Sequence, residues 1–180
     1  MKLRFDSFYI SPIQIQDAWS ICDFVIANEN RLKRYFPITL SENATPELSH
    51  LFVKKKVKEF HAKEEFLFTI KKDNINSLVG IIYLKALDWT HERGELAYCI
   101  SSPNENKGIT TNAVKLLCDY AFEQFNLKTL KIIVHKTNLA SIKVAENCNF
   151  TWIKTLKKEH TPLGEPPLDM ELYELYKDME

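Results

Sequence analysis

The strongest constraint on the fold of this chain is the segment from Glu95 to Asn149, where strand, loop, helix and strand patterns follow one another directly. The strand pattern ends near Ile100, and the polar sequence of residues 104–108 cannot extend it. An apolar helix pattern then begins at Ile109, so its first backbone N–H groups have no partner within the helix. These donors, together with the positive end of the helix dipole, favour an anion such as phosphate.

The loop before this helix has the composition of an anion-binding turn. Gly108 lacks a Cβ atom and lets the main chain approach a bound group closely. Lys107 places a positive charge next to that glycine. Since no other glycine-containing loop directly precedes a long helix pattern, we expect the backbone amides from Asn106 to Thr110 to bind phosphate groups.

The N-terminal half of the chain alternates between strand and helix patterns. Its apolar spacing predicts a strand, a helix, an irregular connection and a second helix, over Leu3–Ile13, Asp17 to Asn28 or Asn30, Arg31–Asn43 and Pro46–Phe60. Thr45 and Pro46 form a typical N-cap and first-turn pair for the second helix. Its lysines are expected to form a solvated outer face, with an anion site as the alternative; they are Lys54, Lys55, Lys56 and Lys58.

The C-terminal half predicts the remaining strands and two more helices. An antiparallel hairpin comes first, with strands over Phe66–Lys72 and Leu78–Leu87. A strand, a long helix, a strand, a short helix and two final strands follow, over Gly94–Ile100, Ile109–Phe125, Leu130–Val134, Asn138–Cys148, Phe150–Leu156 and Leu168–Tyr176. The polar link Lys157–Pro167 contains three prolines and one glycine, and we expect it to be mobile.

Length and composition limit the class of protein. A chain of 180 residues, 45% of them hydrophobic, can bury a substantial core and suits one domain over residues 1–180. Lysine plus arginine and aspartate plus glutamate both number 24, so neither a nucleic acid nor a polyacidic partner is indicated. No apolar run is long enough to cross a bilayer, and residues 1–4 lead into a strand pattern rather than a signal sequence. We therefore expect a cytoplasmic protein without a nucleic-acid or membrane partner, and a homodimer is an open alternative.

The cysteines and histidines show no metal-binding spacing. The cysteines lie far apart without a CxxC pair, and we expect reduced, buried thiols at Cys22, Cys99, Cys118 and Cys148. The five histidines are spread over separate predicted elements. We predict no structural or catalytic metal.

Two sequence strings in the C-terminal half resemble a known family. The string NENKGITTNA of residues 104–113 is similar to the pyrophosphate-binding turn of the GCN5-related N-acetyltransferases, the GNAT family. The string NLASIKVAENCNF of residues 138–150 resembles the next segment in the branch that acetylates N-termini of ribosomal proteins. At the positions of Glu105, Gly108 and Thr110, the family motif has Gln or Arg, then Gly, then Gly or Ala. The resemblance implies an α/β (α+β) fold with a mixed, mostly antiparallel central sheet of about six or seven strands and about four flanking helices.

The resemblance also implies acetyl transfer from acetyl-CoA, as co-substrate, to an amine. In the family, the main chain at the end of the fourth strand pairs with the pantetheine arm, and strand separation there opens the acyl slot. The corresponding residues here are Ile100, Ser101 and Ser102. The turn that would hold the diphosphate consists of Glu105, Asn106, Lys107, Gly108, Ile109 and Thr110. We expect Glu105 to direct its amide to the phosphates and its carboxylate to solvent.

Acetyl transfer needs a neutral amine and a proton donor for the leaving thiolate. Many relatives use a tyrosine as general acid, but Ala145 holds that place here, and Ser141 lies one turn earlier on the same side of the helix. Ser141 therefore either donates this proton or only bonds to the helix backbone. Asn138, in the same way, either binds the pantetheine amide or caps the helix.

Two carboxylates are candidates for contact with the acceptor amine. Glu95 lies between apolar residues in a strand, where an unpaired carboxylate is costly. It either pairs with a neighbour such as Arg93 or acts as a base through water. Glu159 begins the polar link, where the resemblance implies a carboxylate directed to the amine, and a solvated loop charge is the alternative.

The cost of deprotonation indicates the class of acceptor. At pH 7, removing a proton costs about 1 kcal/mol for an α-amine with a pKa near 7.8, and about 4.6 kcal/mol for a lysine-like amine with a pKa near 10.4. Because the sequence shows no clear Asp/His relay, we predict an α-amine acceptor, either a protein N-terminus or a small molecule such as an amino acid. Two alternatives stay open. One is a degenerate domain that binds acyl-CoA or a protein without turnover, and the other is an antibiotic or polyamine acetyltransferase, which Glu159, Glu165 and Asp169 would suit.

Overall fold

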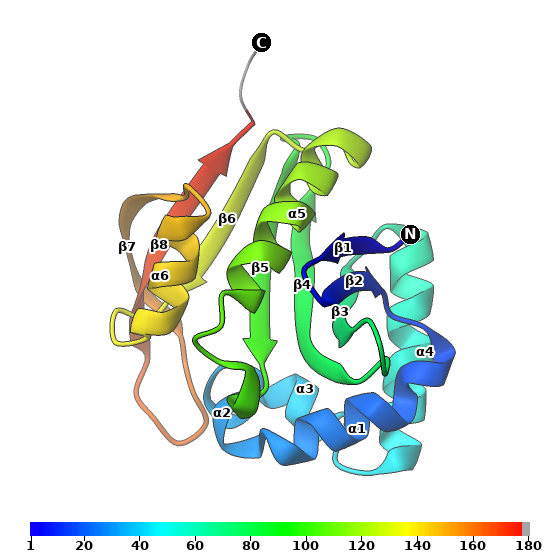
Figure 1. The fold of residues 1–180 in the computed structure, drawn as a ribbon. Helices are drawn as coiled ribbons and strands as arrows, with labels where there is room; N and C mark the ends of the chain where they lie inside the picture. Colours follow the sequence, from blue (N-terminus) through cyan, green and yellow to red (C-terminus); the bar gives the residue numbers. More distant parts are fainter. Residues whose placement is uncertain (178–180) are drawn as a thin grey trace.

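An eight-stranded sheet forms the centre of the computed structural model, which describes residues 1–177 (Figure 1). The strands lie in the order β1, β2, β3, β4, β5, β6, β8 and β7. All neighbouring strands are antiparallel except β5 and β6, which are parallel. In chain order, β1 to β8 span Leu3–Phe5, Phe8–Pro12, Phe66–Lys72, Leu78–Asp88, Arg93–Ile100, Thr129–Val134, Thr151–His160 and Leu168–Tyr176.

Six α-helices, with two short 3-10 helices, connect the strands in the described part of the chain. In chain order, α1 to α6 span Ala18–Ala27, Glu29–Tyr35, Pro37–Ser41, Pro46–Ala62, Ile109–Gln124 and Leu139–Asn147. The 3-10 helices η1 and η2 span Ile15–Asp17 and Ser102–Asn104. Across residues 1–177, no helix has the length and apolar character needed to span a bilayer.

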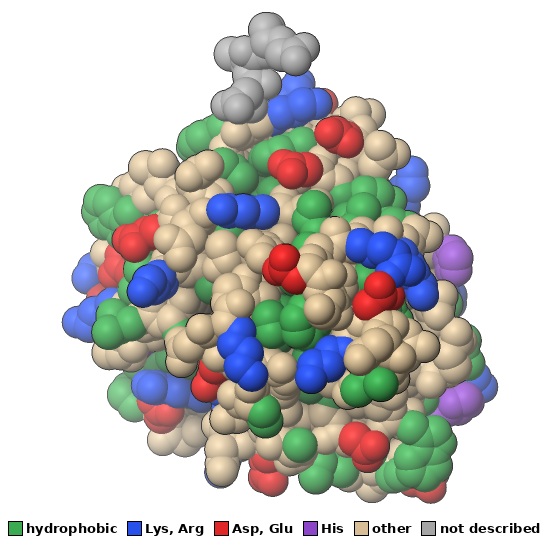
Figure 2. All heavy atoms as spheres, in the orientation of Figure 1, with side chains coloured by type: hydrophobic (Ala, Val, Ile, Leu, Met, Phe, Trp, Pro, Cys, Tyr) green, Lys and Arg blue, Asp and Glu red, His purple; other side chains and the backbone are tan. Residues whose placement is uncertain are grey.

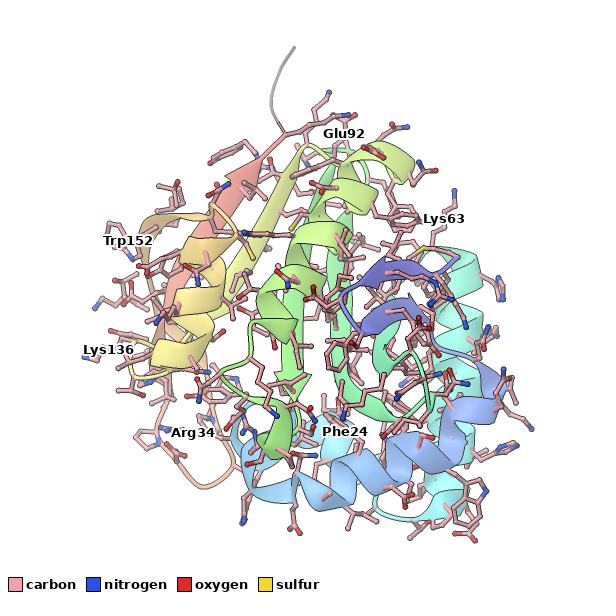
Figure 3. The ribbon with its side chains drawn as sticks, viewed as in Figure 1. Phe24, Arg34, Lys63, Glu92, Lys136 and Trp152 are labelled. Atoms are coloured by element: carbon pink, nitrogen blue, oxygen red, sulfur yellow. The ribbon has the colours of Figure 1, made fainter. Side chains whose placement is uncertain are left out.

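The two faces of the sheet are covered by different helices. Side chains alternate along each strand, so Phe66 and Phe68 of β3 pack with α5 and α6, whereas Leu67 between them packs with α1 and α4. Phe24 of α1 belongs to the second of these two cores (Figure 3). Acidic and basic side chains are mixed over the face seen in Figure 2, in agreement with the balanced charge of the chain.

The mixed, mostly antiparallel sheet expected from the sequence is confirmed, but it has more strands and helices than expected. The pattern over Leu3–Ile13 forms two strands because the chain turns at Asp6, whose φ of 44° is left-handed. The prediction of an irregular connection over Arg31–Asn43 is wrong, because most of this segment forms α2 and α3. Fully buried Leu32 anchors α2, and Pro37 opens α3 at its first residue.

Both helix caps predicted from the sequence are confirmed. Thr45 caps α4 by accepting a hydrogen bond from the Leu48 amide. Asn138 caps α6 in the same way, by accepting one from the Ser141 amide. The four cysteines are free and buried, as expected.

One lysine of α4 departs from the predicted solvated face. Lys56 is buried, and its ammonium group pairs with the carboxylates of Glu59 and Glu65. Its neighbours Lys54 and Lys55 are exposed, as expected. A buried charge requires partners, and the two glutamates supply them.

Strand β7 continues to His160, beyond its predicted end at Leu156. His160 still pairs with Leu168 of β8, which extends the antiparallel ladder. The polar link therefore shortens to residues 161–167. Glu159, expected at the start of a loop, lies on β7 instead.

Strands β5 and β6 separate after a short contact. They pair only over Arg93–Glu95 and Thr129–Lys131. Beyond Glu95, β5 continues to Ile100 paired with β4 alone, while β6 pairs with β8 on its other side. The divergence is visible in Figure 1. The strand separation that we expected at this place is therefore confirmed.

Candidate active site

The turn before α5 has the backbone geometry of an anion site. Gly108 is the N-cap residue of α5 and has a φ of 73°, a left-handed conformation that favours glycine. A Cβ atom at Gly108 would meet no heavy atom within 4 Å, so the space beside it is open. The first helical hydrogen bond runs from the Asn112 amide to the Gly108 carbonyl. The amides of residues 109–111 are therefore outside the helical ladder.

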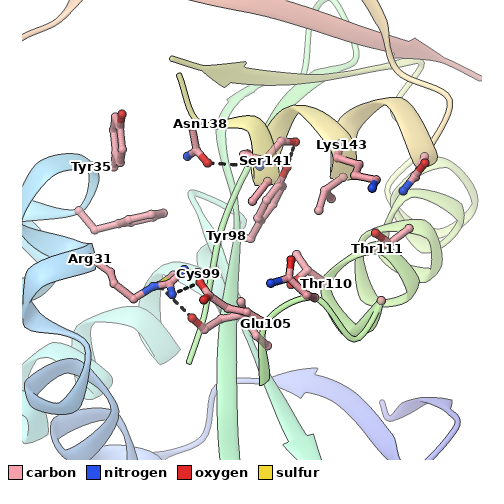
Figure 4. A pocket seen from close by; sticks show the side chains of 17 residues that line it. Arg31, Tyr35, Tyr98, Cys99, Glu105, Thr110, Thr111, Asn138, Ser141 and Lys143 are labelled. Carbon is pink, nitrogen blue, oxygen red and sulfur yellow. Dashed lines mark hydrogen bonds and ion pairs between the residues drawn. The ribbon is translucent and has the colours of Figure 1, made fainter. Parts of the chain in front are cut away.

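A cavity of about 400 Å³, the α5 cavity, opens beside this turn (Figure 4). Seven of the residues singled out in the sequence line it, namely Ile100, Glu105, Asn106, Gly108, Thr110, Asn138 and Ser141. Further lining residues come from α2 and its C-cap, β5, α5 and α6, and they include Arg31, Tyr35, Phe36, Tyr98, Cys99, Thr111 and Lys143. The turn and the short helix α6, which were predicted separately, thus face one cavity.

A second cavity of about 280 Å³, the β6 cavity, lies where β5 and β6 separate. The predicted residues Glu95 and Glu159 line it. Five residues line both cavities, and they are Tyr35, Phe36, Tyr98, Asn138 and Ser141. The two cavities therefore share a wall, and we refer to these five residues as the shared wall.

Tyr98 and Ser141 are joined by two hydrogen bonds in the shared wall (Figure 4). Ser141 Oγ donates to Tyr98 Oη over 3.0 Å, and Tyr98 Oη donates to the backbone carbonyl of Ser141 over 3.1 Å. Burial raises the pKa of Tyr98 above its ordinary value, and the bond to Ser141 opposes this only in part. The phenol therefore stays protonated at neutral pH.

The carboxylate of Glu105 does not point freely to solvent, as we expected, but forms an ion pair with Arg31. The two side chains are 34% and 37% exposed, respectively. Arg31 lies on α2, in the segment predicted as irregular, so no sequence pattern indicated this partner. The pair lines the α5 cavity and balances the negative charge that Glu105 adds beside the turn.

Glu95 pairs with lysines rather than with Arg93. Its carboxylate lies 3.2 Å from Lys85 Nζ and 3.9 Å from Lys131 Nζ. The side chain is 14% exposed, so it is both paired and in contact with the β6 cavity. Glu159 lines the same cavity from β7. In residues 1–177, no three acidic, histidine or cysteine side chains lie close enough to hold a metal ion.

Some residues expected to contact the cofactor line neither cavity, namely Ser101, Ser102, Lys107 and Ile109. The amides of the two serines already donate within the protein, to the Val79 carbonyl and to Asn28 Oδ1. The lysine ammonium donates to the Pro103 carbonyl, and the isoleucine is buried in the core. The side-chain cations of the α5 cavity are Arg31 and Lys143 instead.

The sequence carried a signal for one of the residues that we missed. Tyr98 follows Leu96 by two positions on β5, so strand alternation places both on the same face. Strand alternation does not indicate that Tyr98 is hydrogen bonded to Ser141, which lies 43 residues further along the chain. Arg31 and Tyr35 carried no such signal, because their helix was not predicted.

A mixed sheet with two separating strands, an open glycine turn before a helix and two cavities with a shared wall defines an acyl-CoA-dependent transferase. Residues 8–151 match the family described as "Acetyltransferase (GNAT) domain". The chain belongs to this family, as the sequence strings indicated, and is an acetyl-CoA-dependent N-acetyltransferase.

Several known proteins are similar to this chain. The spermidine N(1)-acetyltransferase of Escherichia coli (strain K12) is 32% identical over 105 residues, which cover 58% of this chain and 53% of that protein. The solved ribosomal-protein-S5-alanine acetyltransferase of Vibrio fischeri has a TM-score of 0.89 at 21% identity, covering 99% of this chain and 97% of its own. RimL, a ribosomal L7/L12 α-N-protein acetyltransferase solved with coenzyme A, also has a TM-score of 0.89, at 15% identity and 99% coverage of both chains. The two structures share the fold of this chain.

Proposed function

We propose that this enzyme transfers the acetyl group of acetyl-CoA to an α-amine, such as a protein N-terminus or an amino acid, by direct attack in a ternary complex. The observation that carries this proposal is the shared wall between the two cavities. Two substrates in adjoining cavities can react without a covalent enzyme intermediate, because the protein already holds them next to each other.

Acetyl-CoA occupies the α5 cavity in this proposal. The open face of Gly108 and the unused amides of residues 109–111 support placing the diphosphate at the turn from Asn106 to Thr110. The pantetheine arm then runs along the separated part of β5 at Ile100 toward Asn138. The thioester lies at Ser141, where the α5 cavity meets the β6 cavity.

The acceptor amine occupies the β6 cavity. Its nitrogen attacks the thioester carbonyl carbon, the C–S bond breaks with its electron pair on sulfur, and the Ser141 hydroxyl gives its proton to that sulfur. The attacking nitrogen loses a proton to Glu95 through water. Glu159 contributes a second carboxylate on the amine side of the cavity.

Acidic side chains that are already paired with basic ones favour a single amine over a polyamine, and two of these acidic residues line neither cavity. Of the three carboxylates that would suit a polyamine, Glu165 is paired with Arg34, whose position is labelled in Figure 3, and Asp169 is paired with Lys157. Glu95 is also compensated, by Lys85. An acceptor with several positive charges would have to displace these lysines and the arginine.

Thiol release from acetyl-CoA over a panel of amines tests the proposal. The panel contains short peptides with a free N-terminus, free amino acids, an Nα-acetylated lysine and spermidine. We expect turnover with an α-amine and none with the Nα-blocked lysine. Faster turnover of spermidine would replace this proposal with polyamine acetylation, and no release with any amine would indicate a domain that binds without turnover.

The Arg31–Glu105 pair leads to two opposite expectations for CoA affinity. Changing Glu105 to Gln removes a negative charge and releases the Arg31 guanidinium beside the phosphates, so CoA should bind about 2- to 5-fold more tightly. Changing Arg31 to Ala leaves an unbalanced carboxylate there and should weaken binding by a similar factor. Calorimetric titration of both variants with CoA checks this, and a large loss in the glutamine variant would contradict it.

The proposed base role of Glu95 predicts a pH-dependent defect. Changing Glu95 to Gln should lower kcat/KM about 10- to 100-fold at pH 7. The loss should shrink above a pH of about 7.8, because an α-amine is then largely neutral without a base. The matched control is Glu123→Gln, an exposed carboxylate on α5. An equal loss at every pH would assign Glu95 a structural role instead.

A further inference from the structure

We propose that Tyr98 is a positioning residue for proton donation, because its hydroxyl holds the Ser141 hydroxyl in place in the shared wall. This inference rests on the proposed role of Ser141 as proton donor. Tyr98 lies on β5, Ser141 lies on α6, and both line the two cavities.

The position of Tyr98 follows from the separation of β5 and β6. Tyr98 still pairs with Ile82 of β4, so its backbone is fixed in the sheet. On its other side, β5 is no longer paired with β6, because the pairing between these two strands ends at Glu95. The ring packs against the core cluster below α5 and α6, and its hydroxyl reaches α6 at Ser141. A rigid strand therefore carries a hydroxyl group to the place where the cavities meet.

The directions of the two hydrogen bonds support a positioning role. A serine inside a helix commonly donates to the carbonyl four residues earlier, but Ser141 lies in the first turn of α6 and Thr137, four residues earlier, precedes the N-cap Asn138. Here Ser141 Oγ donates to Tyr98 Oη instead, over 3.0 Å. The tyrosine has a single hydroxyl proton and gives it to the Ser141 carbonyl. Its oxygen is therefore free to accept from the serine and fixes the direction of the serine hydroxyl.

The same arrangement stabilises Ser141 after it has given up its proton. When the Ser141 O–H turns from Tyr98 Oη to the thiolate sulfur and gives up its proton, negative charge develops on Ser141 Oγ. The Tyr98 O–H can turn from the carbonyl to this oxygen, since both atoms belong to one residue and lie at similar distances. A preorganised donor of this kind lowers the cost of the charge that develops. The proton that Glu95 has received from the amine nitrogen then returns through water to Ser141 Oγ, so both residues regain their starting protonation and the transfer balances.

The experiment compares two tyrosines, half-buried Tyr98 and buried Tyr83, whose hydroxyl groups are both hydrogen bonded within the protein. Tyr98→Phe keeps the ring and its packing but removes the hydroxyl. Tyr83→Phe is the matched control, because the Tyr83 hydroxyl is also buried and hydrogen bonded, to Thr39 over 2.8 Å, and lines neither cavity. Both changes are also combined with Ser141→Ala, and kcat, KM and CoA affinity are measured for each variant.

We expect Tyr98→Phe to lower kcat about 10- to 100-fold while CoA affinity stays at the parent value. Tyr83→Phe should keep the parent kcat. In the Ser141→Ala background, Tyr98→Phe should lower kcat no further, because the hydroxyl that it positions is already absent.

Three results would overturn the inference. If Tyr98→Phe has the parent kcat and Ser141→Ala has a reduced kcat, Tyr98 has no positioning role, and Ser141 keeps its proposed role as proton donor. An equal further loss in the Ser141→Ala background would show that Tyr98 acts independently of the serine. A parent kcat for Ser141→Ala would remove the proposed role of the serine and, with it, this inference.

Discussion

Replacing Gly108 with valine should weaken CoA binding about 10- to 100-fold. Gly108 has a φ of 73°, a conformation that costs a non-glycine residue about 1–3 kcal/mol and is worst for a β-branched one. To avoid this strain, the turn would rotate its amides away from the phosphates. A Cβ atom would also project into the open space where the diphosphate is proposed to lie. Calorimetric titration with CoA measures the loss.

The control for this variant is Gly164→Val. Gly164 has a φ of 76° and open space at its Cβ position, but it lies in the link between β7 and β8, away from the α5 cavity. It should lose stability without losing CoA affinity. If Gly108→Val folds and binds CoA like the parent protein, the diphosphate lies elsewhere.

Replacing Ser141 with alanine should lower turnover about 10²- to 10⁴-fold, which is the usual cost of losing a positioned general acid. CoA affinity should stay close to that of the parent protein, because the thiol group next to Ser141 is only a small part of the bound cofactor. Steady-state kinetics with the best acceptor measure turnover, and calorimetry measures affinity. Asn138 still caps α6 through the Ser141 backbone amide, so the helix should be retained.

The control for the serine variant is Ser20→Ala, which removes a hydroxyl from α1 at a position that lines neither cavity. It should keep the parent rate. Parent-like turnover by Ser141→Ala would mean that water protonates the thiolate and that the serine is only a helix residue.

Local chemistry explains which parts of the fold could be predicted from the sequence. The turn at Gly108 and the caps at Thr45 and Asn138 are encoded by a few adjacent residues, and the structure has the turn and both caps. Helices α2 and α3 were missed because they are short, and α2 is anchored by the buried side chain of Leu32 rather than by a long periodic pattern. Tertiary packing, which a local pattern does not record, determines such helices.

Several residues that line the two cavities could be singled out from the sequence, but the partners of their side chains could not. Glu105 was recognised as an unusual carboxylate in the turn, yet its partner Arg31 lies on a helix that the sequence did not indicate. Glu95 was recognised as needing a partner, which proved to be Lys85 on the neighbouring strand instead of Arg93. A strand pattern shows which face a side chain occupies, whereas the register that selects its neighbour depends on pairing between distant segments.

The short contact between β5 and β6 divides the sheet into two half-sheets joined by a seam of three residue pairs. Gly94 lies within this seam, and a Cβ atom there would approach Leu84 Cδ1 to 2.8 Å. A side chain at Gly94 would have to displace this leucine or shift β5 in the place where the half-sheets are hydrogen bonded to each other. Gly94 directly precedes Glu95, so the residue that allows the half-sheets to pair closely stands next to a carboxylate that lines the β6 cavity.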